Sequence, residues 1–510
     1  MLFMASNKIV ELDRLAEIVD SLKKQGKRVV LCHGVFDLIH VGHIRHFQKA
    51  REYGDVLVVT LTVDKHVNKG PGRPVFNLDL RMEVIATLDI VDFVSYSELP
   101  QSVHVLKTIK PNFYVKGMDY KDASKDHTGG ILLEEEAINS VGGQLVFTDD
   151  IVFSSSNLIN RFMTNFPKEV KDYLTGFRGR YKKDDIVEYV KKSKTLKVLT
   201  IGETIVDEYQ YCESIGKSSK EPTLAVRDLY TKKFAGGILA VANHVSNFCD
   251  EVGLVSVLGD RDTQEEFIAT TLNSKVKQMF FHRHDSPTIV KKRLIEYYFF
   301  TKMLEVYTIN DTALSKEDDA AVCAMLEKAI PEYDLVIVVD FGHSMMSKKA
   351  IDIISSKAKY LALNVQANAG NMGFNVVSKF PRADYITMAE KELRLEARDI
   401  RGELEHMLEH VSKKMKCQKV VVTRGKNGSL CYDRDEGFFL IPALAHTVVD
   451  RVGAGDAFLS ISALCAYQGA PMEVVGFVGN AVGAYAVSTV CNEKPMERAS
   501  LCKQIETLMK

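Results

Sequence analysis

Short β-branched runs alternate with helical patterns along most of this chain of 510 residues. Among the first 162 residues, strand patterns fall at 28–32, 55–61, 92–95, 113–116 and 144–147. Helical patterns lie between and after them at 41–52, 78–89, 101–109, 131–141 and 155–163. Strands that alternate with helices are typical of a parallel sheet with helical crossover connections. The sequence therefore predicts an α/β domain over 1–162.

A second α/β region follows a break in this pattern. Residues 163–194 are rich in Lys and Tyr and helical in pattern, which indicates a linker between two domains. A new buried-strand pattern begins at 196–201. Later strand patterns fall at 335–340, 360–364, 385–388 and 419–423. We therefore expect residues 195–510 to form one large α/β/α sandwich.

The charge balance and the cysteines restrict the partners of the protein. Lys and Arg number 66 against 67 Asp and Glu, a formal net charge of -1, which provides no field for a nucleic-acid backbone. The nine cysteines are scattered without metal-ligand spacing, as expected of reduced thiols. No stretch approaches the roughly 20 apolar residues of a membrane span. We expect small-molecule partners, no nucleic acid, no membrane insertion and a cytoplasmic location.

The segment after the first strand pattern carries the first candidate site. A strand, a Gly-containing turn and a helix start together present backbone N–H groups and the positive end of a helix dipole to an anion. Two imidazole N–H groups at this place can donate to a phosphate that gains charge in a transition state. The glycine between the histidines lets the phosphate approach the chain closely. The residues of this site are Gly34, Phe36, Asp37, His40, Gly42 and His43.

Two other interpretations of His40 and His43 stay open at this point. A metal site would need a third ligand, which no nearby residue supplies convincingly. Two histidines without a chemical role would also explain the bare spacing, although the strand, turn and helix together favour a phosphate site.

The run from Gly34 to His43 resembles the H-x-G-H signature of the cytidylyltransferase-like nucleotidyltransferase superfamily. Residues 28–162 resemble the nucleotidyltransferase domain of bacterial ADP-heptose synthase, which implies a Rossmann-like fold. The resemblance continues at further nucleotide-binding positions: Lys69, Arg73, Arg81, Lys116, Asp119, Ser154, Ser155 and Ser156. Met118 and the pair Ser155-Ser156 depart from the usual residues, so the choice between ATP and CTP stays open.

The resemblance also implies a reaction. A sugar phosphate attacks the α-phosphate of a nucleoside triphosphate, and pyrophosphate leaves. Because the attacking oxygen is already ionised, catalysis depends on positioning and on charge neutralisation by His40, His43, Lys69, Arg81 and Mg²⁺.

A second glycine-rich motif, Gly453-Ala454-Gly455-Asp456, precedes a helical run of small residues. Glycines at a helix start expose consecutive N–H groups, which can form an anion hole for a transferring γ-phosphate. The Asp456 carboxylate lies where it can accept the proton of an attacking hydroxyl. The competing interpretation is a glycine-rich turn with an aspartate that only caps the helix.

Residues 196–510 resemble the ribokinase-like sugar kinases, and most closely the heptose kinase half of ADP-heptose synthase. The resemblance implies ATP as phosphoryl donor, an adenine pocket bordered by Asn480, and an indirect role for Glu392 in binding Mg²⁺. It also implies a small β lid over 208–232, through which relatives often form homodimers. The implied sugar-binding residues are Asp207, Gly236, Gly237, Lys291, Arg293 and Asp340.

Several substrate-side positions depart from the heptose kinases. Ala240 replaces a sugar-binding Asn, the run Asn364-Val365-Gln366 replaces Asp-Pro-Lys, and Ala389 replaces the Asn of an N-x-x-E motif that ends at Glu392. A buried hydroxyl that loses its partner costs about 1–3 kcal/mol. These changes argue against an unaltered heptose phosphate pocket, and they permit the view that the kinase half is weakened.

Three functional hypotheses follow. The first is a bifunctional enzyme that makes an ADP- or CDP-activated, heptose-like sugar for a surface glycan, with the two domains in the reverse of the usual order. The second is a cytidylyltransferase for a polyol phosphate that the kinase domain supplies. The third is a nucleotide-binding scaffold or sensor with a weakened kinase half.

Overall fold

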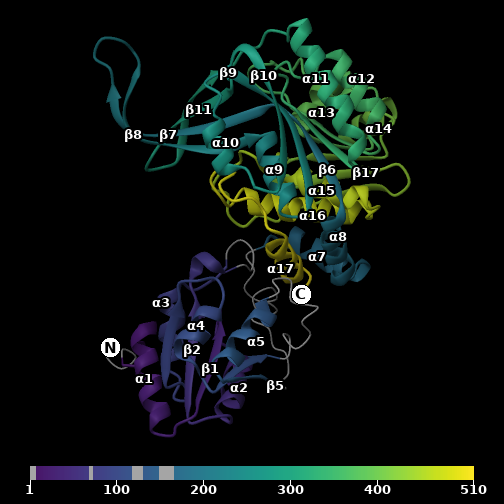
Figure 1. The fold of residues 1–510 in the computed structure, drawn as a ribbon. Helices are drawn as coiled ribbons and strands as arrows, with labels where there is room; N and C mark the ends of the chain where they lie inside the picture. The colour runs from purple at the N-terminus through teal and green to yellow at the C-terminus, as the bar shows by residue number, and fades with distance from the viewer. Residues whose placement is uncertain (1–6, 68–72, 118–129, 149–165) are drawn as a thin grey trace. The chain divides into compact units, whose positions relative to one another are not determined.

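The computed structural model describes residues 7–67, 73–117, 130–148 and 166–510, which are drawn in colour in Figure 1. The chain divides into two compact units. The first comprises Met1–Asn165 and Cys502–Lys510, and the second comprises Phe166–Leu501. In the described part of the chain, no helix combines the length and apolar character needed to cross a bilayer.

The first unit contains a parallel sheet of five strands in the order β3-β2-β1-β4-β5. All five strand predictions are confirmed, with ends that differ by one or two residues. The strands are β1 (Val29–Gly34), β2 (Val56–Thr62), β3 (Phe93–Ser97), β4 (Phe113–Gly117) and β5 (Gln144–Thr148). The helices are α1 (Leu12–Lys24), α2 (Val41–Arg51), α3 (Leu78–Ala86), α4 (Val103–Ile109) and α5 (Gly130–Ser140). Helix α1 was not predicted, and the predicted helix over 155–163 lies outside the described residues.

Both faces of this sheet are buried. Alternate residues of a strand point to opposite faces, so Val30 and Cys32 of β1 enter one hydrophobic cluster and Leu31 enters another. Helices α2 and α3 cover the first face, and α1, α4 and α5 cover the second. The strand order reverses beside β1, where β2 and β4 lie on opposite sides of it. Ligands of open α/β sheets bind at the carboxyl ends of strands at such a switch point.

The second unit is built on a sheet of nine strands in the order β10-β9-β6-β13-β14-β15-β16-β17-β18. Neighbours from β10 to β16 are parallel, and β17 and β18 are antiparallel. The strands that were predicted are all present. The nine are β6 (Lys197–Gly202), β9 (Glu251–Arg261), β10 (Val276–Pro287), β13 (Leu335–Asp340), β14 (Leu361–Val365), β15 (Tyr385–Ala389), β16 (Lys419–Thr423), β17 (Ser429–Asp433) and β18 (Gly437–Ile441).

Helices cover both faces of this sheet, which confirms the predicted α/β/α sandwich. One layer packs into a large hydrophobic cluster and consists of α11 (Lys316–Ala329), α12 (Lys348–Lys357), α13 (Glu390–Ala397) and α14 (Leu404–Lys414). The other contains three helices that are buried along most of their length: α9 (Ile238–Ser246), α15 (Ala454–Tyr467) and α16 (Met472–Ala486). Two further helices are α10 (Glu265–Thr271), in this unit, and α17 (Arg498–Leu508), most of which belongs to the first unit.

A separate small sheet has the strand order β12-β11-β7-β8 and lies where the β lid was expected. Its strands are β7 (Thr204–Lys217), β8 (Leu224–Gly237), β11 (Ile289–Glu296) and β12 (Thr301–Thr308). The hairpin of β7 and β8 extends away from the body of its unit (Figure 1). Asp207 and Gly236 therefore lie in strands of the lid sheet.

Two helices occupy most of the segment that was predicted to be a linker. They are α7 (Lys168–Arg180) and α8 (Lys183–Lys192), and both belong to the second unit. The fully buried Phe177 ring stacks on Phe477 with ring centroids 4.4 Å apart. Arg180 donates two hydrogen bonds to Glu473. We propose that α7 is an integral part of the second unit and not a linker.

Phe177→Ala tests this proposal. Deletion of a fully buried phenyl ring costs about 3–5 kcal/mol of folding free energy, because it removes apolar burial and leaves a cavity. We expect a loss of this size in the transition of the second unit, measured by chemical denaturation and calorimetry of the full chain.

The matched control is Phe374→Ala, since the Phe374 side chain is 85% exposed. Its effect should stay within about 0.5 kcal/mol. A loss equally small for Phe177→Ala would show that α7 is only a tether.

Candidate functional sites

The two histidines of the first motif form the N-terminus of α2. Two residues of the preceding turn, Phe36 and Leu38, have positive φ angles of 48° and 50°. His40 is the N-cap residue, and its Nδ1 accepts a hydrogen bond of 3.1 Å from the backbone N–H of Gly42. The backbone N–H of His40 in turn donates to Nδ1 of His43 at 3.4 Å. The spacing of the motif therefore satisfies the helix terminus reciprocally, as in a capping box.

This arrangement selects the tautomer of both rings. Because each Nδ1 accepts a backbone N–H, the proton of each neutral imidazole lies on Nε2. The two rings stack with centroids 4.0 Å apart and an interplanar angle of 29°. His40 and His43 thus present two N–H donors side by side at the positive end of a helix. Among the described residues, no group of three or more His, Cys, Asp or Glu could hold a metal ion.

Asp37 links the turn before α2 to the segment that contains Val75 and Phe76. Its buried carboxylate accepts hydrogen bonds from the backbone N–H groups of Val75 at 2.8 Å and Phe76 at 3.1 Å. Arg73 lies 3.9 Å from the same carboxylate, and burial lowers the pKa of its guanidinium. Phe36 packs edge-on against His43, with centroids 5.6 Å apart. Asp37 and Phe36 therefore support the histidine pair.

Two predicted phosphate ligands lie in internal networks instead. Arg81 is fully buried, and its guanidinium donates to the carbonyls of Phe76, Val35 and Thr62 and to the Asp64 carboxylate. Lys116 forms a buried ion pair with Glu134 at 2.8 Å, and Glu134 also accepts from Ser102. The predicted ligands Lys69, Asp119, Ser154, Ser155 and Ser156 lie outside the described residues.

Two further histidines near this site were missed from the sequence. His33, at the carboxyl end of β1, contacts Thr60 at 2.9 Å and Thr62 at 3.3 Å, and burial lowers its pKa to about 3. His46 contacts the Thr148 hydroxyl at 3.0 Å, which joins α2 to the end of β5. The spacing of three residues between His43 and His46 is the sequence signal that places both on one side of α2.

The second glycine-rich motif forms the N-terminus of α15. Gly453 is the N-cap residue with a φ of 82°, and a side chain there would overlap the amide of Asn492, so only glycine fits. At Gly455 an added Cβ would meet no atom within 4 Å, so open space lies beside the first turn. The N–H groups of a first turn have no partner inside the helix. This helix start can therefore receive an anion.

Asp456 lies in the same first turn and is only 8% exposed. Its Oδ1 accepts a hydrogen bond of 2.6 Å from the side-chain amide of Gln366. The pKa of this carboxyl is raised to about 7, mainly by burial. The charges of Asp207 and Glu392 also raise it, whereas the Gln366 hydrogen bond and the charge of Lys291 lower it. A carboxyl poised near neutral pH suits a group that accepts a proton from a hydroxyl.

The lid sheet brings four of the predicted sugar-binding residues together. Asp207 of β7 stands opposite Lys291 of β11, and the Asp207 carboxylate forms a buried ion pair with Arg293. Gly236 lies so close to this carboxylate that a side chain there would overlap it. The Lys291 ammonium lies 5.1 Å from the ring centroid of Tyr307, and burial lowers its pKa. The neighbouring Gly237 ends β8.

Three other predicted residues are held in internal contacts. Asp340, at the end of β13, is fully buried and pairs with Lys379. The Glu392 oxygens accept hydrogen bonds from the backbone N–H groups of Ala367 at 3.1 Å and Ala389 at 2.7 Å. Asn480 donates to Ser429 at 2.6 Å and to its own helix. Asp340 and Glu392 therefore shape the loops that follow β13 and β14.

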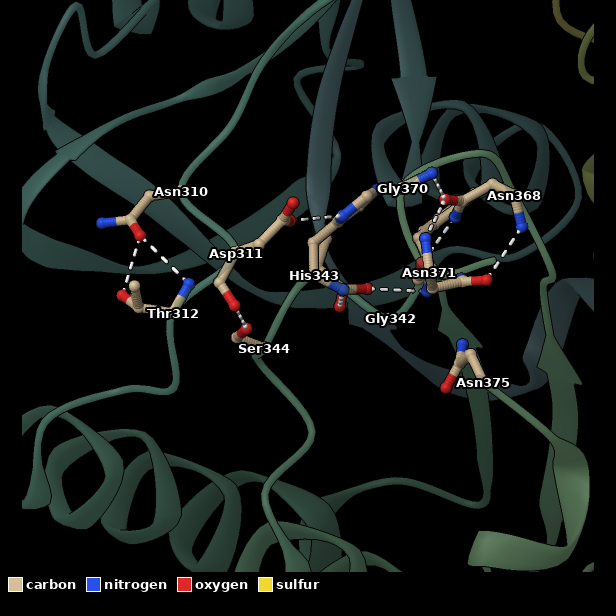
Figure 2. A network of polar contacts seen from close by, with 12 residues as sticks. Asn310, Asp311, Thr312, Gly342, His343, Ser344, Asn368, Gly370, Asn371 and Asn375 are labelled. Atoms are coloured by element: carbon tan, nitrogen blue, oxygen red, sulfur yellow. Dashed lines mark hydrogen bonds and ion pairs between the residues drawn. The ribbon is translucent and has the colours of Figure 1, made fainter. Parts of the chain in front are cut away.

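These loops meet in a network of asparagines (Figure 2). Asn368 and Asn371, which follow β14, both donate to the carbonyl of Phe341, at 2.7 Å and 3.0 Å, in the loop after β13. Asn375 donates to the Asp340 carbonyl at 3.0 Å. The network fixes the carboxyl ends of β13 and β14 relative to each other.

Asp450 was not singled out from the sequence, although it stands three residues before Gly453. Its buried carboxylate accepts the Tyr209 hydroxyl at 2.6 Å and the backbone N–H groups of Val452 and Cys491, each at 3.1 Å. It also pairs with Lys302. Burial opposes the charge, but these donors together lower the pKa of Asp450. The carboxylate therefore fastens the glycine loop to lid strands β7 and β12.

The raised pKa of Asp456 predicts a stability effect with a defined sign. The folded protein keeps the proton up to about pH 7, whereas an unfolded aspartate loses it near pH 4, roughly its reference pKa. Between these values the folded state binds the extra proton, so its stability falls as the pH rises. Asp456→Asn removes this penalty, and it should stabilise the second unit by about 2–4 kcal/mol more at pH 8 than at pH 4.

Denaturant unfolding at both pH values measures this difference. Asp352→Asn, at an exposed position of α12, is the matched control. An equal effect of Asp456→Asn at pH 4 and pH 8 would contradict the raised pKa.

Comparisons with known proteins match both halves of the chain. Residues 195–497 match the model of the pfkB family of carbohydrate kinases, and residues 31–161 match the cytidylyltransferase-like model. The bifunctional protein HldE of Geotalea uraniireducens (strain Rf4) is 39% identical over 167 residues, and that of Geobacter metallireducens is 35% identical over 167 residues. Each alignment covers 32% of this chain and 32% of the relative, so the chain spans about a third of the length of the curated relatives it matches.

A solved structure agrees with the kinase fold. Phosphofructokinase-2 from Escherichia coli in complex with potassium has a TM-score of 0.50 and 14% sequence identity, over 62% of this chain and 100% of that one. At this identity the likeness concerns the fold alone. Because the pfkB model matches more than half of the chain, the chain belongs to the pfkB family of carbohydrate kinases, with a cytidylyltransferase-like domain before the kinase domain.

Proposed function

We propose that this chain phosphorylates a sugar in one unit and joins a sugar phosphate to a nucleotide in the other, which yields an ADP- or CDP-activated sugar for a surface glycan. The observation that carries the proposal is the buried carboxyl of Asp456, with a pKa of about 7, beside the open first turn of α15. The HldE relatives, which are named bifunctional, support the pairing of the two reactions.

In the kinase reaction, MgATP and a sugar are the substrates. The Asp456 carboxylate accepts the proton of a sugar hydroxyl, the hydroxyl oxygen attacks the γ-phosphorus, and ADP leaves with the bridging oxygen. The N–H groups of the first turn of α15 stabilise the charge on the transferring group. Asp207, Lys291 and Arg293 line the sugar side, because the lid sheet gathers them on one face.

In the nucleotidyl transfer, no protein base is needed. An oxygen of the sugar phosphate attacks the α-phosphorus of ATP or CTP, and pyrophosphate leaves. The Nε2–H groups of His40 and His43 donate to the α-phosphate oxygens as their charge grows. Lys69, Asp119 and Ser154 to Ser156 contact the nucleotide in this proposal, while Arg81 and Lys116 support the fold from their internal networks.

Mg²⁺ fits this chain best as a part of the nucleotide substrate. Within the described ranges no cluster of three acidic or imidazole ligands exists, and both Glu392 oxygens are occupied by backbone N–H groups. Mg²⁺ commonly keeps several waters and binds through substrate phosphates. Glu392 therefore acts indirectly, through the loop at Ala367, and the ion provides charge neutralisation when it arrives with ATP.

A homodimer through the lid sheet belongs to the same proposal. Two exposed apolar side chains, Leu304 and Val306, are two residues apart in β12 and therefore point to the same face of the sheet. Neighbouring exposed apolar side chains can form part of a protein interface. Sedimentation of the wild-type protein should give twice the 57.1 kDa mass of the chain. The double variant Leu304→Glu with Val306→Glu should sediment as a monomer, because burying charged side chains in the interface is unfavourable. A wild-type monomer at micromolar concentration would contradict the dimer.

A cytoplasmic location is proposed on the state of the cysteines. All nine lie among the described residues, and each is buried and outside any disulfide bond. Disulfides are rare in reducing compartments.

Two single variants of the full chain separate the activities. Pyrophosphate release is measured with ATP and with CTP against sugar 1-phosphates and polyol phosphates, and ADP release is measured with ATP against sugars, sugar phosphates and polyols. His43→Ala should lower pyrophosphate release by about 10²–10³-fold because a transition-state donor is lost. Asp456→Asn should lower ADP release by about 10²–10⁴-fold because the base is lost.

Each variant is the control for the other, since each should keep the activity of the opposite unit. A CDP product from a polyol phosphate would favour the cytidylyltransferase alternative. Nucleotide binding without turnover by the wild-type chain, unchanged in both variants, would replace the proposal with a sensor or scaffold.

A further inference from the structure

The hydrogen bond between Gln366 and Asp456 joins two residues that are 90 positions apart. The Gln366 amide N–H donates to Oδ1 of Asp456 at 2.6 Å, a close contact. Asp456 Oδ1 accepts it, and no other hydrogen bond to this carboxylate is made by the described residues. The amide is therefore the one group that fixes the rotation of the candidate base.

The backbone of Gln366 is fixed from both sides. Its N–H donates to the Asp340 carbonyl at 2.9 Å, which continues the pairing of β14 with β13. Its own carbonyl accepts the side-chain amides of Asn371 at 2.9 Å and Asn375 at 3.2 Å, two members of the network in Figure 2. The next residue, Ala367, donates to Glu392. A side chain that starts from so constrained a backbone has little freedom to leave Asp456.

We propose that Gln366 is a positioning residue of the kinase site, whose amide orients the Asp456 carboxylate and stabilises its charged form. The inference rests on the proposed kinase function and deepens it. Gln366 itself exchanges no proton: the hydroxyl proton passes to Asp456, while the amide N–H remains donated to Oδ1. Oδ2 stays available for the substrate hydroxyl.

The surrounding charges explain why such a donor is needed. Asp207 on β7 and Glu392 on α13 both oppose a charge on Asp456, and Lys291 on β11 favours it. Burial opposes the charge further. An unassisted carboxyl in these surroundings would hold its proton at neutral pH and could not act as a base. The Gln366 amide offsets part of this effect without adding a net charge.

The test is a series of substitutions at Gln366 in the full chain, some of which should raise the pKa of Asp456 and one of which should lower it. Gln366→Leu is close in size and lacks the donor, so the pKa of Asp456 should rise by about one pH unit. Gln366→Glu should raise it at least as much through charge repulsion, and Gln366→Lys should lower it, because an ammonium favours the carboxylate. Gln278→Leu makes the same chemical change at an exposed position of β10 and is the matched control.

The first readout is the titration of carboxyl-¹³C-labelled aspartate by NMR, with the Asp456 signal assigned by its loss in Asp456→Asn. This measurement needs no turnover. The second is the acid limb of kcat/KM for ADP release with the acceptor that gives the highest wild-type rate. For Gln366→Leu the rate at pH 7 should fall by about fivefold and recover above pH 9, as expected if only the protonation of the base has changed.

The outcomes distinguish the two levels of the proposal. If the wild-type chain transfers no phosphoryl group but the NMR titration shifts with the three predicted signs, the kinase function fails and the Gln366 contact stands. If phosphoryl transfer occurs and the three variants move neither the titration nor the acid limb, or move both in one direction, the role of Gln366 is wrong. A uniform loss of rate at every pH, with an unfolding midpoint lower than that of Gln278→Leu, would also reject it in favour of a purely structural contact.

Discussion

Unpaired N–H groups at the start of a helix are the physical constraint on which both candidate sites depend. A helix cannot satisfy the donors of its own first turn, so the surrounding chain must either occupy them or leave them for an anion. At α2, His40 and His43 satisfy part of the terminus with their Nδ1 atoms and thereby turn the two Nε2–H groups into donors. At α15, Gly453 and Gly455 leave the first turn open. At α2 the histidine side chains provide N–H donors in addition to those of the helix end. At α15 the glycines leave the backbone N–H groups of the helix end uncovered by side chains.

Asp450 and Asp456, one before the glycine motif and one at its end, differ in role: the first holds loops together and the second is the candidate base. Asp450 accepts one hydroxyl, two backbone N–H groups and an ammonium, and these donors lower its pKa despite deep burial. Asp456 accepts a single amide and its pKa rises to about 7. A carboxylate that is saturated with donors holds loops together but is a poor base, because its charged form is already stabilised. Near-complete burial with one donor leaves Asp456 able to take a proton.

The strands and both motifs could be predicted because their signals are local. Buried parallel strands are continuous apolar runs, and the runs at β13, β15 and β16 were recognised almost to the residue. Helix starts that follow glycine turns are local in the same way. Residue roles that depend on distant partners could not be predicted. Arg81 had the chemistry of a phosphate ligand, but carbonyls from three segments surround it, and only the folded chain brings these segments together.

The same limit explains why Gln366 was noticed only as a departure from heptose kinases. Its partner Asp456 lies 90 residues away in the sequence, and nothing local to either residue indicates the contact.

The three departures also bear on whether the kinase half has decayed. At Ala389 the backbone N–H still donates to Glu392, so the loss of an asparagine side chain leaves this helix start intact. At Gln366 the backbone completes the β13–β14 pairing, and the new side chain contacts the candidate base. Ala240 is buried within α9 and leaves no unpaired polar group there. At Asn364 the side-chain amide N–H donates to the Thr387 carbonyl, while the buried Oδ1 accepts no hydrogen bond from the described residues, which costs about 1–3 kcal/mol. The contacts at Ala389 and Gln366 therefore keep the loops around Asp456 in place, and the unpaired Asn364 oxygen is the one uncompensated polar atom at the departing positions among the described residues.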